Sequence, residues 1–199
     1  MESIRHTPSL ILASASPRRR ELLHQAGVPF TVLASGAPEL LAPGEEPAAF
    51  VLRVAREKAV EVASRSSNRW VLAADTIVVI EGTILGKPQN KEDAQGMLQR
   101  LSGKSHQVMT AFVLLAPART IFHEQVVTST VTFKPLSDSQ IRNYLATGEP
   151  FDKAGAYAVQ GLGAMLVKQV EGSYTNVVGL PIDETVAVLR RARLLPEHL

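Results

Sequence analysis

The sequence predicts a mixed α/β fold in which an elongated sheet combines parallel and antiparallel strands and carries flanking helices. Apolar runs of strand length alternate with segments of helical period, a pattern typical of α/β proteins. Several strand-like runs are joined by short turns such as Glu81-Gly82, and short turns join antiparallel strands. The chain has 199 residues, 45% of them hydrophobic, without repeats or linkers, so we expect one domain over 1–199.

Local signals place each element of the first part of the chain. Ser16 is a good helix cap, Pro17 suits the first helical position, and Gly27 can end the helix. Short apolar runs predict strands, and a stretch rich in glycine, proline and acid predicts a loop. The expected order is a strand at 10–13, a helix from 16 or 17, a strand at 30–34, a loop at 35–47 and an amphipathic helix at 48–66.

The remaining elements follow from the same signals. Asn90 caps a helix that runs through Leu101, and Ser137 with Gln140 forms a capping box for a later helix that Gly148 ends. The expected order is a strand at 70–80, a strand at 83–86, a helix at 91–101, a hairpin of 108–115 and 121–133, a helix at 138–147, a strand pair of 164–170 and 174–178, and a helix from 181 to about 194.

Composition excludes several classes of protein. The absence of cysteine rules out disulfides, thiolate catalysis and cysteine metal sites. No apolar run approaches the roughly 20 residues of a membrane span, and the N-terminal run is too short for a signal peptide, so we expect a cytoplasmic protein without a membrane partner. The net charge of +2 gives little reason to expect a nucleic-acid partner.

Four places carry charge or glycine where the local pattern favours something else. Arg18, Arg19 and Arg20 fall in the first turn of a helix, at the positive end of its dipole, where acids are favoured. Lys58 lies about 20° from Val51 on a helical wheel, in the centre of the apolar stripe. It either extends past the edge of the core or points into a cleft toward an anion.

The other two places are an acid in an apolar run and a glycine-rich segment. Asp75 interrupts "VLAADTIVVI", and a buried carboxylate is costly unless it is paired, hydrogen-bonded or bound to a metal. It is either a paired structural acid or a metal ligand or general base at the end of a central strand. The segment 149–163 contains glycines that permit close approach of a ligand, or it is a loop with turn glycines.

Together these residues fit a phosphate ester with a divalent metal, because cations neutralise phosphate oxygens while carboxylates bind the metal. The cations are Arg18, Arg19, Lys58 and Lys87, and the acids are Asp75 with one or more of the loop residues Glu39, Glu45 and Glu46. A phosphatase of the haloacid dehalogenase type needs a second aspartate where Ile77 stands. P-loop, zinc-protease and serine-hydrolase motifs are absent from the sequence.

Five motifs occur in an order that resembles the Maf family of nucleoside triphosphate pyrophosphatases. They are "SASPRRRELL", "LAADTIVVIEGTILGKP", "MLQRLSGKSHQVMTAFVL", "GEPFDKAGAYAVQGLGAMLV" and "GSYTNVVGLP". The resemblance runs from about Leu10 to about Leu189. It implies a two-lobed fold similar to inosine triphosphate pyrophosphatases with a central cleft, and hydrolysis between the α and β phosphates with Mg²⁺ or Mn²⁺. It also implies a homodimer and removal of unwanted nucleotides from the cell.

The resemblance assigns roles to residues that match the family motifs. It implies Asp75, Lys58 and Lys87 in catalysis, and Glu39 and Asp75 at the metal. Pro38 stands where relatives often carry a second acid, so Glu45 and Glu46 stay open as alternatives to Glu39. The implied substrate-binding residues are Ser14, Arg18, Arg19, Thr76, Asp152, Lys153 and Gln160.

The same resemblance points to a substrate class. Arg18, Thr76 and Gln160 match the branch that acts on dTTP and UTP, with CTP and modified pyrimidine nucleotides as further candidate substrates. Thr76 and Gln160 would read the pyrimidine edge. Arg18 and Arg19 would hold phosphate oxygens at the helix start, whereas Arg20 matches a variable position and is expected on the surface. The alternative is a non-enzymatic nucleotide- or nucleic-acid-binding regulator of septum formation.

Overall fold

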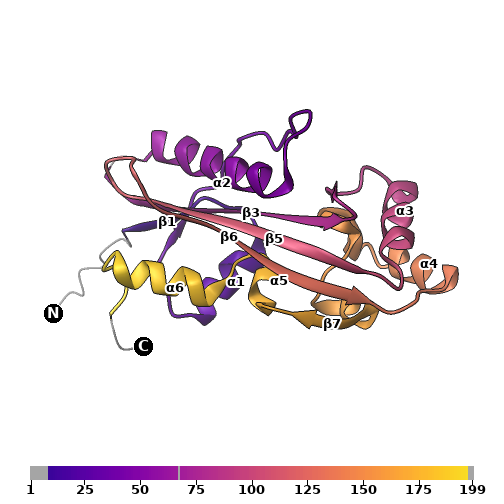
Figure 1. Cartoon of the computed structure of the whole chain (residues 1–199). Helices are drawn as coiled ribbons and strands as arrows, with labels where there is room; N and C mark the ends of the chain where they lie inside the picture. Colours follow the sequence, from indigo (N-terminus) through magenta and orange to yellow (C-terminus); the bar gives the residue numbers. More distant parts are fainter. Residues whose placement is uncertain (1–8, 67, 197–199) are drawn as a thin grey trace.

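A long twisted sheet organises the fold, seen in a computed structural model that describes residues 9–66 and 68–196 (Figure 1). The strands are β1 (Leu10–Leu12), β2 (Thr31–Val32), β3 (Trp70–Ile80), β4 (Thr83–Leu85), β5 (Ser105–Leu115), β6 (Ile121–Phe133) and β7 (Val167–Glu171). The helices are α1 (Pro17–Gln25), α2 (Pro47–Ser64), α3 (Lys91–Leu101), α4 (Asp138–Ala146), α5 (Tyr174–Val178) and α6 (Ile182–Arg191). The 3₁₀ turns are η1 (Glu149–Asp152), η2 (Ala154–Ala156) and η3 (Gly161–Leu166).

The sheet is mixed, as predicted. Its order is β2-β1-β3-β5-β6-β7, with β4 paired to β3. β1 is parallel to both β2 and β3, whereas the pairs β3–β4, β3–β5, β5–β6 and β6–β7 are antiparallel. The predicted hairpin of β5 and β6 is confirmed.

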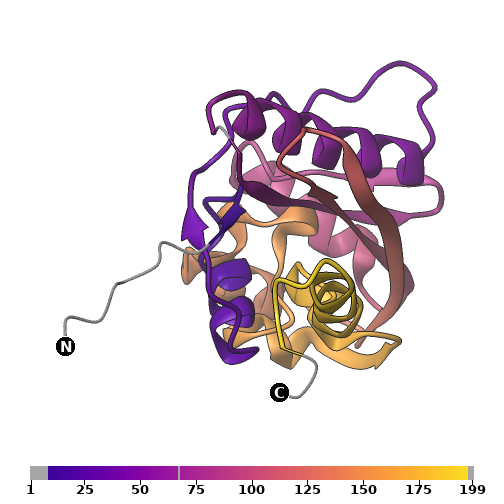
Figure 2. The same ribbon diagram turned by 90° about the vertical axis from the view of Figure 1, so that its left-hand side faces the viewer.

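Helices cover both faces of the sheet and divide the core into three parts. α2 packs on one face with a cluster that includes Val51, Val62 and Val113. α1 and α6 lie on the other face at one end of the sheet, and α3 and α4 lie at the opposite end (Figures 1 and 2). The predicted α/β class, with an elongated mixed sheet and flanking helices, is confirmed.

A gap in the sheet runs along one edge of β3. β1 pairs with β3 only up to Leu72, and β4 pairs with it only from Val78 onward. β5 pairs with the opposite edge along the whole interval. Within 9–66 and 68–196, no strand therefore pairs with the edge of residues 73–77. β1 ends at this gap and leads into α1, and in open α/β sheets ligands bind in crevices at such strand ends.

The expected helix caps are present. The Ser16 hydroxyl accepts a hydrogen bond from the Arg19 backbone N–H, and Asn90 Oδ1 accepts one from Asp93 N–H at 2.8 Å. Ser137 and Gln140 form the capping box of α4. These side chains satisfy N–H groups that a helix start leaves unpaired, so they fix where each helix begins.

Three sequence-based predictions of secondary structure need correction. The strand expected at 30–34 is reduced to Thr31–Val32. The strand expected from 164 begins at Val167, because η3 occupies the preceding residues. The segment 174–178 is helix α5, since the Ser173 hydroxyl caps it by accepting the Asn176 N–H. Among the described residues, none of the helices has the length and apolar character needed to cross a membrane.

Candidate active site

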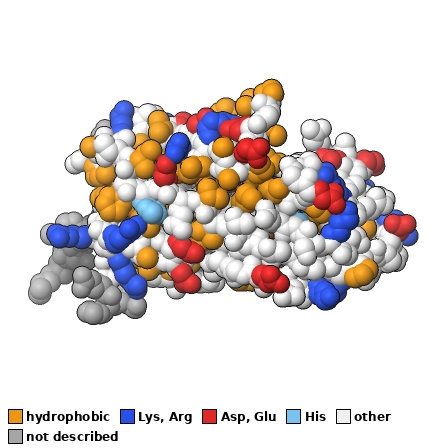
Figure 3. All heavy atoms as spheres, in the orientation of Figure 1, with side chains coloured by type: hydrophobic (Ala, Val, Ile, Leu, Met, Phe, Trp, Pro, Cys, Tyr) orange, Lys and Arg blue, Asp and Glu red, His pale blue; other side chains and the backbone are white. Residues whose placement is uncertain are grey.

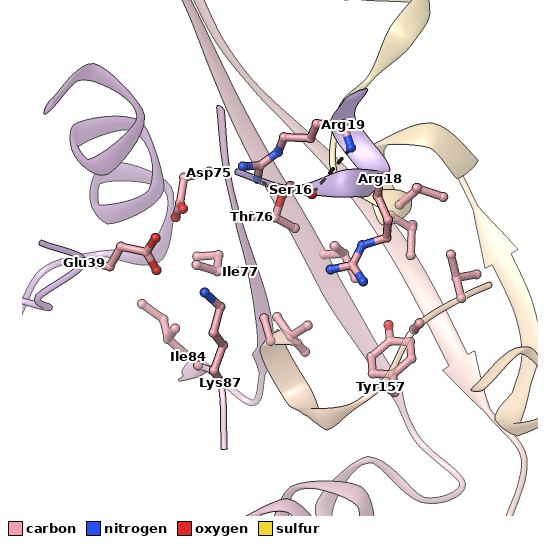
Figure 4. A pocket seen from close by; sticks show the side chains of 18 of the residues that line it. Ser16, Arg18, Arg19, Glu39, Asp75, Thr76, Ile77, Ile84, Lys87 and Tyr157 are labelled. Atoms are coloured by element: carbon pink, nitrogen blue, oxygen red, sulfur yellow. Dashed lines mark hydrogen bonds between the residues drawn. The ribbon is translucent and has the colours of Figure 1, made fainter. Parts of the chain in front are cut away.

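A cavity of about 460 Å³ opens at the gap beside β3 (Figure 4). This volume lies within the usual range of small-molecule sites. Its walls come from the loop before α2, from α2 itself, from β3, from the start of α1 and from the segment around η2. Residues from both faces of β3 line the cavity, because Asp75 and Thr76 point to opposite sides of the strand.

One lysine joins two carboxylates at one wall of the cavity. Lys58 Nζ lies 2.7 Å from Asp75 Oδ1 and 2.6 Å from Glu39 Oε1. Lys58 is only 8% exposed and Asp75 only 6%. The helical wheel therefore placed Lys58 correctly, on the buried face of α2. Its ammonium group does not extend into solvent but points into the cleft toward anions.

The charges of the cavity act together on Glu39. Burial would raise the pKa of this carboxyl, but the Lys58 hydrogen bond and the positive charges of Lys58, Lys87 and Arg19 lower it below its usual value. Glu39 stays ionised at neutral pH as a result. Three of the four basic residues predicted from the sequence, Lys58, Lys87 and Arg19, are thus close enough to influence one acid at the cavity.

The position of Asp75 differs from the prediction in one respect. The sequence pattern predicts this acid at the end of a strand, but Asp75 lies in the middle of β3, which continues to Ile80. Asp75 nevertheless lines the cavity, which opens where this edge of β3 lacks a paired strand in the described part of the chain. Asp75 is also ion-paired with Lys58. This one contact fits both interpretations of the sequence, a paired structural acid and a functional acid at a cleft.

Only one of the three loop acids lines the cavity. Glu45 forms hydrogen bonds with Arg53 and with the backbone of Ala42, and these hold the loop against α2. Glu46 precedes α2, and its side chain makes no capping hydrogen bond. Glu39 is the loop acid at the cavity, as the motif alignment indicated.

The three arginines at the start of α1 have separate environments. Arg18 lines the cavity and Arg20 is exposed, as expected for a surface residue. Arg19 is buried, donating from Nε to Gly179 O at 2.8 Å and from Nη2 to Thr76 Oγ1 at 3.0 Å. Burial lowers the pKa of Arg19, while the charges of Asp75 and Glu39 oppose that shift.

The remaining predicted substrate residues divide between the cavity and its surroundings. Lys87, Thr76 and Gln160 line the cavity. Ser14 is buried behind it, and its hydroxyl accepts from Arg19 Nη1 at 3.2 Å. Lys153 and Asp152 pair with each other at 2.5 Å and do not belong to the cavity lining.

A carboxylate shapes the glycine-rich segment that carries Gln160. Glu149 accepts hydrogen bonds from the backbone N–H groups of Leu162 and Gly163 and from the Tyr144 hydroxyl. A Cβ at Gly163 would lie 2.3 Å from the Ala158 oxygen, closer than atoms can approach. The glycine is therefore required for this fold of the loop, which forms one rim of the cavity.

The acidic wall has donors suited to a divalent cation. Among the described residues, no three histidine or acidic side chains converge as a complete metal cage. Glu39 and Asp75, however, both direct an oxygen at a single cation, the Lys58 ammonium. Mg²⁺ is commonly bound by one or two carboxylates together with substrate phosphates and water, so this pair fits such a metal.

Three contributors to the site were missed by the sequence analysis. Tyr157 lines the cavity, and Thr110 and Asn176 lie beneath it, with both of the latter fully buried. Thr110 interrupts the apolar run "VMTAFVLL" as Asp75 interrupts its own run, so the same signal was available. Asn176 gave no comparable signal, because the sequence predicts a strand over its segment, which is helix α5.

The cleft brings two carboxylates together with several cations, an arrangement typical of proteins that bind phosphate esters. Comparison with known proteins defines the class further. The model of the Maf-like protein family matches residues 9–192, and the chain belongs to the Maf family.

Two relatives with high sequence identity support this membership. The dTTP/UTP pyrophosphatase of Geobacter sulfurreducens is 54% identical over 182 residues, covering 92% of this chain and 95% of the relative. The dTTP/UTP pyrophosphatase of Myxococcus xanthus is 54% identical over 187 residues, covering 93% of each. A solved structure of a nucleoside-triphosphatase/dITP/XTP pyrophosphatase from Mycobacterium abscessus matches 94% of this chain and 97% of its own, with 14% identity and a TM-score of 0.42.

Proposed function

We propose that the protein is a nucleoside triphosphate pyrophosphatase that hydrolyses dTTP and UTP to the monophosphate and pyrophosphate. The observation that carries the proposal is the convergence of Glu39 and Asp75 on one buried cation, across a cleft from Arg18 and Arg19. The names of relatives about half identical over most of the chain support the same activity.

The cations would hold the triphosphate. Arg18 and Arg19 lie at the start of α1, where backbone N–H groups and the helix dipole also favour anions. Lys58 and Lys87 would stabilise the charge that develops on the departing pyrophosphate. The mutual repulsion of the arginines, unfavourable in the free protein, is relieved when the phosphates arrive.

The acids would serve the attack of water on the α phosphorus. Glu39 and Asp75 would hold Mg²⁺ or Mn²⁺, and the metal would supply positive charge to neutralise the phosphate oxygens. Asp75 has two possible roles, metal ligand or acceptor of the proton from water. Asp75→Asn distinguishes them by Mn²⁺ binding measured with electron paramagnetic resonance: a ligand role weakens binding, and a base role leaves it unchanged.

The pyrimidine base would occupy the part of the cavity beyond the phosphates. Tyr157 and Ile84 offer apolar surface there, and Gln160 offers an amide able to both donate and accept hydrogen bonds. An amide of this kind can read the edge of a pyrimidine. The Thr76 hydroxyl, predicted for the same task, is already hydrogen-bonded within the protein.

A nucleotide panel tests the proposal. The protein is incubated with dTTP, UTP, CTP and 7-methylguanosine triphosphate in the presence of Mg²⁺, Mn²⁺ or a chelator, and products are separated by chromatography. We expect monophosphate and pyrophosphate from dTTP and UTP, and no turnover with the chelator. Release of single phosphates, or preference for the methylated guanine nucleotide, would contradict the proposal.

The Asp75→Asn variant provides the control for the panel. We expect the rate to fall by about a thousandfold, the usual range for loss of an acid–base group, while the circular dichroism spectrum is unchanged. A near-normal rate would remove Asp75 from the mechanism.

The non-enzymatic alternative and the assembly state have separate measurements. On the face drawn in Figure 3, acidic side chains lie among the basic ones over most of the surface, and several basic side chains group at the left end. Nucleic-acid-binding surfaces gather basic residues over a larger stripe or patch. Binding of nucleotide without turnover would favour the regulator. The expected homodimer stays a prediction that light scattering can check.

A further inference from the structure

The Arg19 guanidinium group is part of a closed ring of hydrogen bonds. Arg19 Nε donates to Gly179 O, and Gly179 N–H donates to Asn176 O at 3.0 Å. Thr110 Oγ1 donates to the same Asn176 oxygen at 3.0 Å. The Thr110 and Thr76 hydroxyls lie 2.9 Å apart, and Thr76 Oγ1 accepts from Arg19 Nη2, which completes the ring.

The chemistry of the ring fixes the direction of its hydroxyl protons. A backbone carbonyl can only accept, so Thr110 donates its one proton to Asn176 O. The Thr110 oxygen can then only accept from Thr76. The Thr76 proton goes to Thr110 at 2.9 Å, the shorter of its two contacts with acceptors, since the Gly179 oxygen lies 3.4 Å away. Thr76 has no proton left for a ligand, and its oxygen is directed at Arg19.

The ring is anchored in the core. Thr110 and Asn176 are fully buried, and Thr110 faces Thr76 in the β3–β5 register. Asn176 Nδ2 donates to Val108 O at 3.0 Å and to Ser129 Oγ at 2.9 Å, which ties α5 to β5 and β6. A rigid support of this kind can fix the orientation of a side chain without contacting the ligand.

Arg19 is held entirely by neutral acceptors. Its three protein hydrogen bonds run to Ser14, Gly179 and Thr76, and Arg19 forms no ion pair in the described part of the chain. Three of its five side-chain N–H donors are occupied, which leaves two donors at the cavity wall without a direct contact to a carboxylate. Such a guanidinium is oriented before the ligand binds.

We propose that Thr110 is a positioning residue of the pyrophosphatase reaction, acting through Thr76 to aim Arg19 at the phosphates of the substrate. Thr76 is on this account part of the support for Arg19 and does not read the base. The inference rests on the proposed function, because it requires a phosphate ligand at Arg19.

Two substitutions separate the hydroxyl of Thr110 from its shape. Thr110→Val keeps the shape and removes the hydrogen bonds, and Thr110→Ser keeps the hydroxyl and removes a methyl group. We expect kcat/KM for dTTP to fall about tenfold in the valine variant. This loss corresponds to about 1.4 kcal/mol, which is within the range for a neutral hydrogen bond. The serine variant should stay within about twofold of the wild type.

Ser129→Ala is the matched control for stability. Its hydroxyl accepts from Asn176 Nδ2 and donates to Ser173 O, so its loss weakens the same helix without touching Thr76 or Arg19. We expect Ser129→Ala to lower the melting temperature and leave kcat/KM unchanged. An equal kinetic loss in Ser129→Ala would show that Thr110 acts only by placing α5, which would overturn the proposal.

A double-mutant cycle with Arg19→Lys tests the route of the effect. Lysine keeps the charge but cannot make the forked contacts of arginine. If Thr110 acts through Arg19, Thr110→Val should cost little more in the Arg19→Lys background, whereas independent effects multiply. Full multiplication, or wild-type kcat/KM in Thr110→Val, overturns the proposal. Absence of dTTP and UTP hydrolysis by the wild-type protein would instead overturn the proposed function.

Discussion

Acid should destabilise this protein through one buried histidine. His106 is 3% exposed, and its Nε2 lies 2.7 Å from the Tyr157 hydroxyl. Its ring packs edge-on against Phe133 and Tyr157, with centroids 5.1 and 5.3 Å away. Burial lowers the pKa of His106 from 6.5 to about 4, because the apolar surroundings disfavour the charged imidazolium.

The size of the effect follows from the difference between the two pKa values. Between pH 6.5 and about 4 the unfolded chain binds a proton at this histidine and the folded protein does not. The free energy of unfolding therefore falls as the pH falls through that range, and His106 has its full stabilising contribution only above pH 6.5. A difference of about 2.5 pKa units corresponds to about 3 kcal/mol.

Urea unfolding measures the free energy of unfolding directly. Trp70 serves as the fluorescent probe because it is the single tryptophan. His106→Gln removes the titrating ring and keeps an amide able to reach Tyr157. We expect the wild type to lose about 3 kcal/mol more than His106→Gln on acidification from pH 6.5 to 4. His24→Gln, at an exposed histidine, is the control. A wild-type-minus-variant difference that does not change with pH would refute the reasoning.

Two further predictions concern the arginines and the glycine-rich segment. Arg18→Ala should lower kcat/KM for dTTP by about tenfold or more, because Arg18 lines the cavity. Arg20→Ala should stay within about twofold of the wild type. Equal losses in steady-state assays of the two variants would contradict this division. Gly163→Ala should cost about 2 kcal/mol of stability because its Cβ would meet the Ala158 oxygen, whereas Gly96→Ala, with open space in α3, should stabilise by about 0.5–1 kcal/mol. Thermal denaturation of both variants checks the pair, and a stable Gly163→Ala would refute the packing argument.

Local signals in the sequence predicted much of the fold. Ser16, Asn90 and Ser137 cap the helices they were expected to cap, because a cap depends on only a few neighbouring residues. The helical period placed Lys58 on the buried face of α2, because the pattern lies within one continuous helix. A segment of only five residues, such as 174–178, carries too little periodicity to distinguish a strand from a helix, and the cap at Ser173 decides the outcome.

Contacts between distant parts of the chain could not be predicted in this way. Arg19 and Gly179 are 160 residues apart, and no local pattern pairs them. The sheet gap is also a property of register, since it depends on where β1 ends and β4 begins beside β3. Asp75 therefore looked like a strand-end residue, although it is a mid-strand residue at an unpaired edge.

Because the cleft opens at the gap beside β3, side chains from both faces of this strand reach it, and the two sides of the cleft can be changed independently. Odd-numbered positions such as Asp75 face α2, and even-numbered positions such as Thr76 face α1 and α5. Substitutions in α2 can thus retune the acidic side while the cationic side keeps its own support. A one-residue insertion in β3 would exchange the two sides, so this strand should tolerate replacement far better than changes in length.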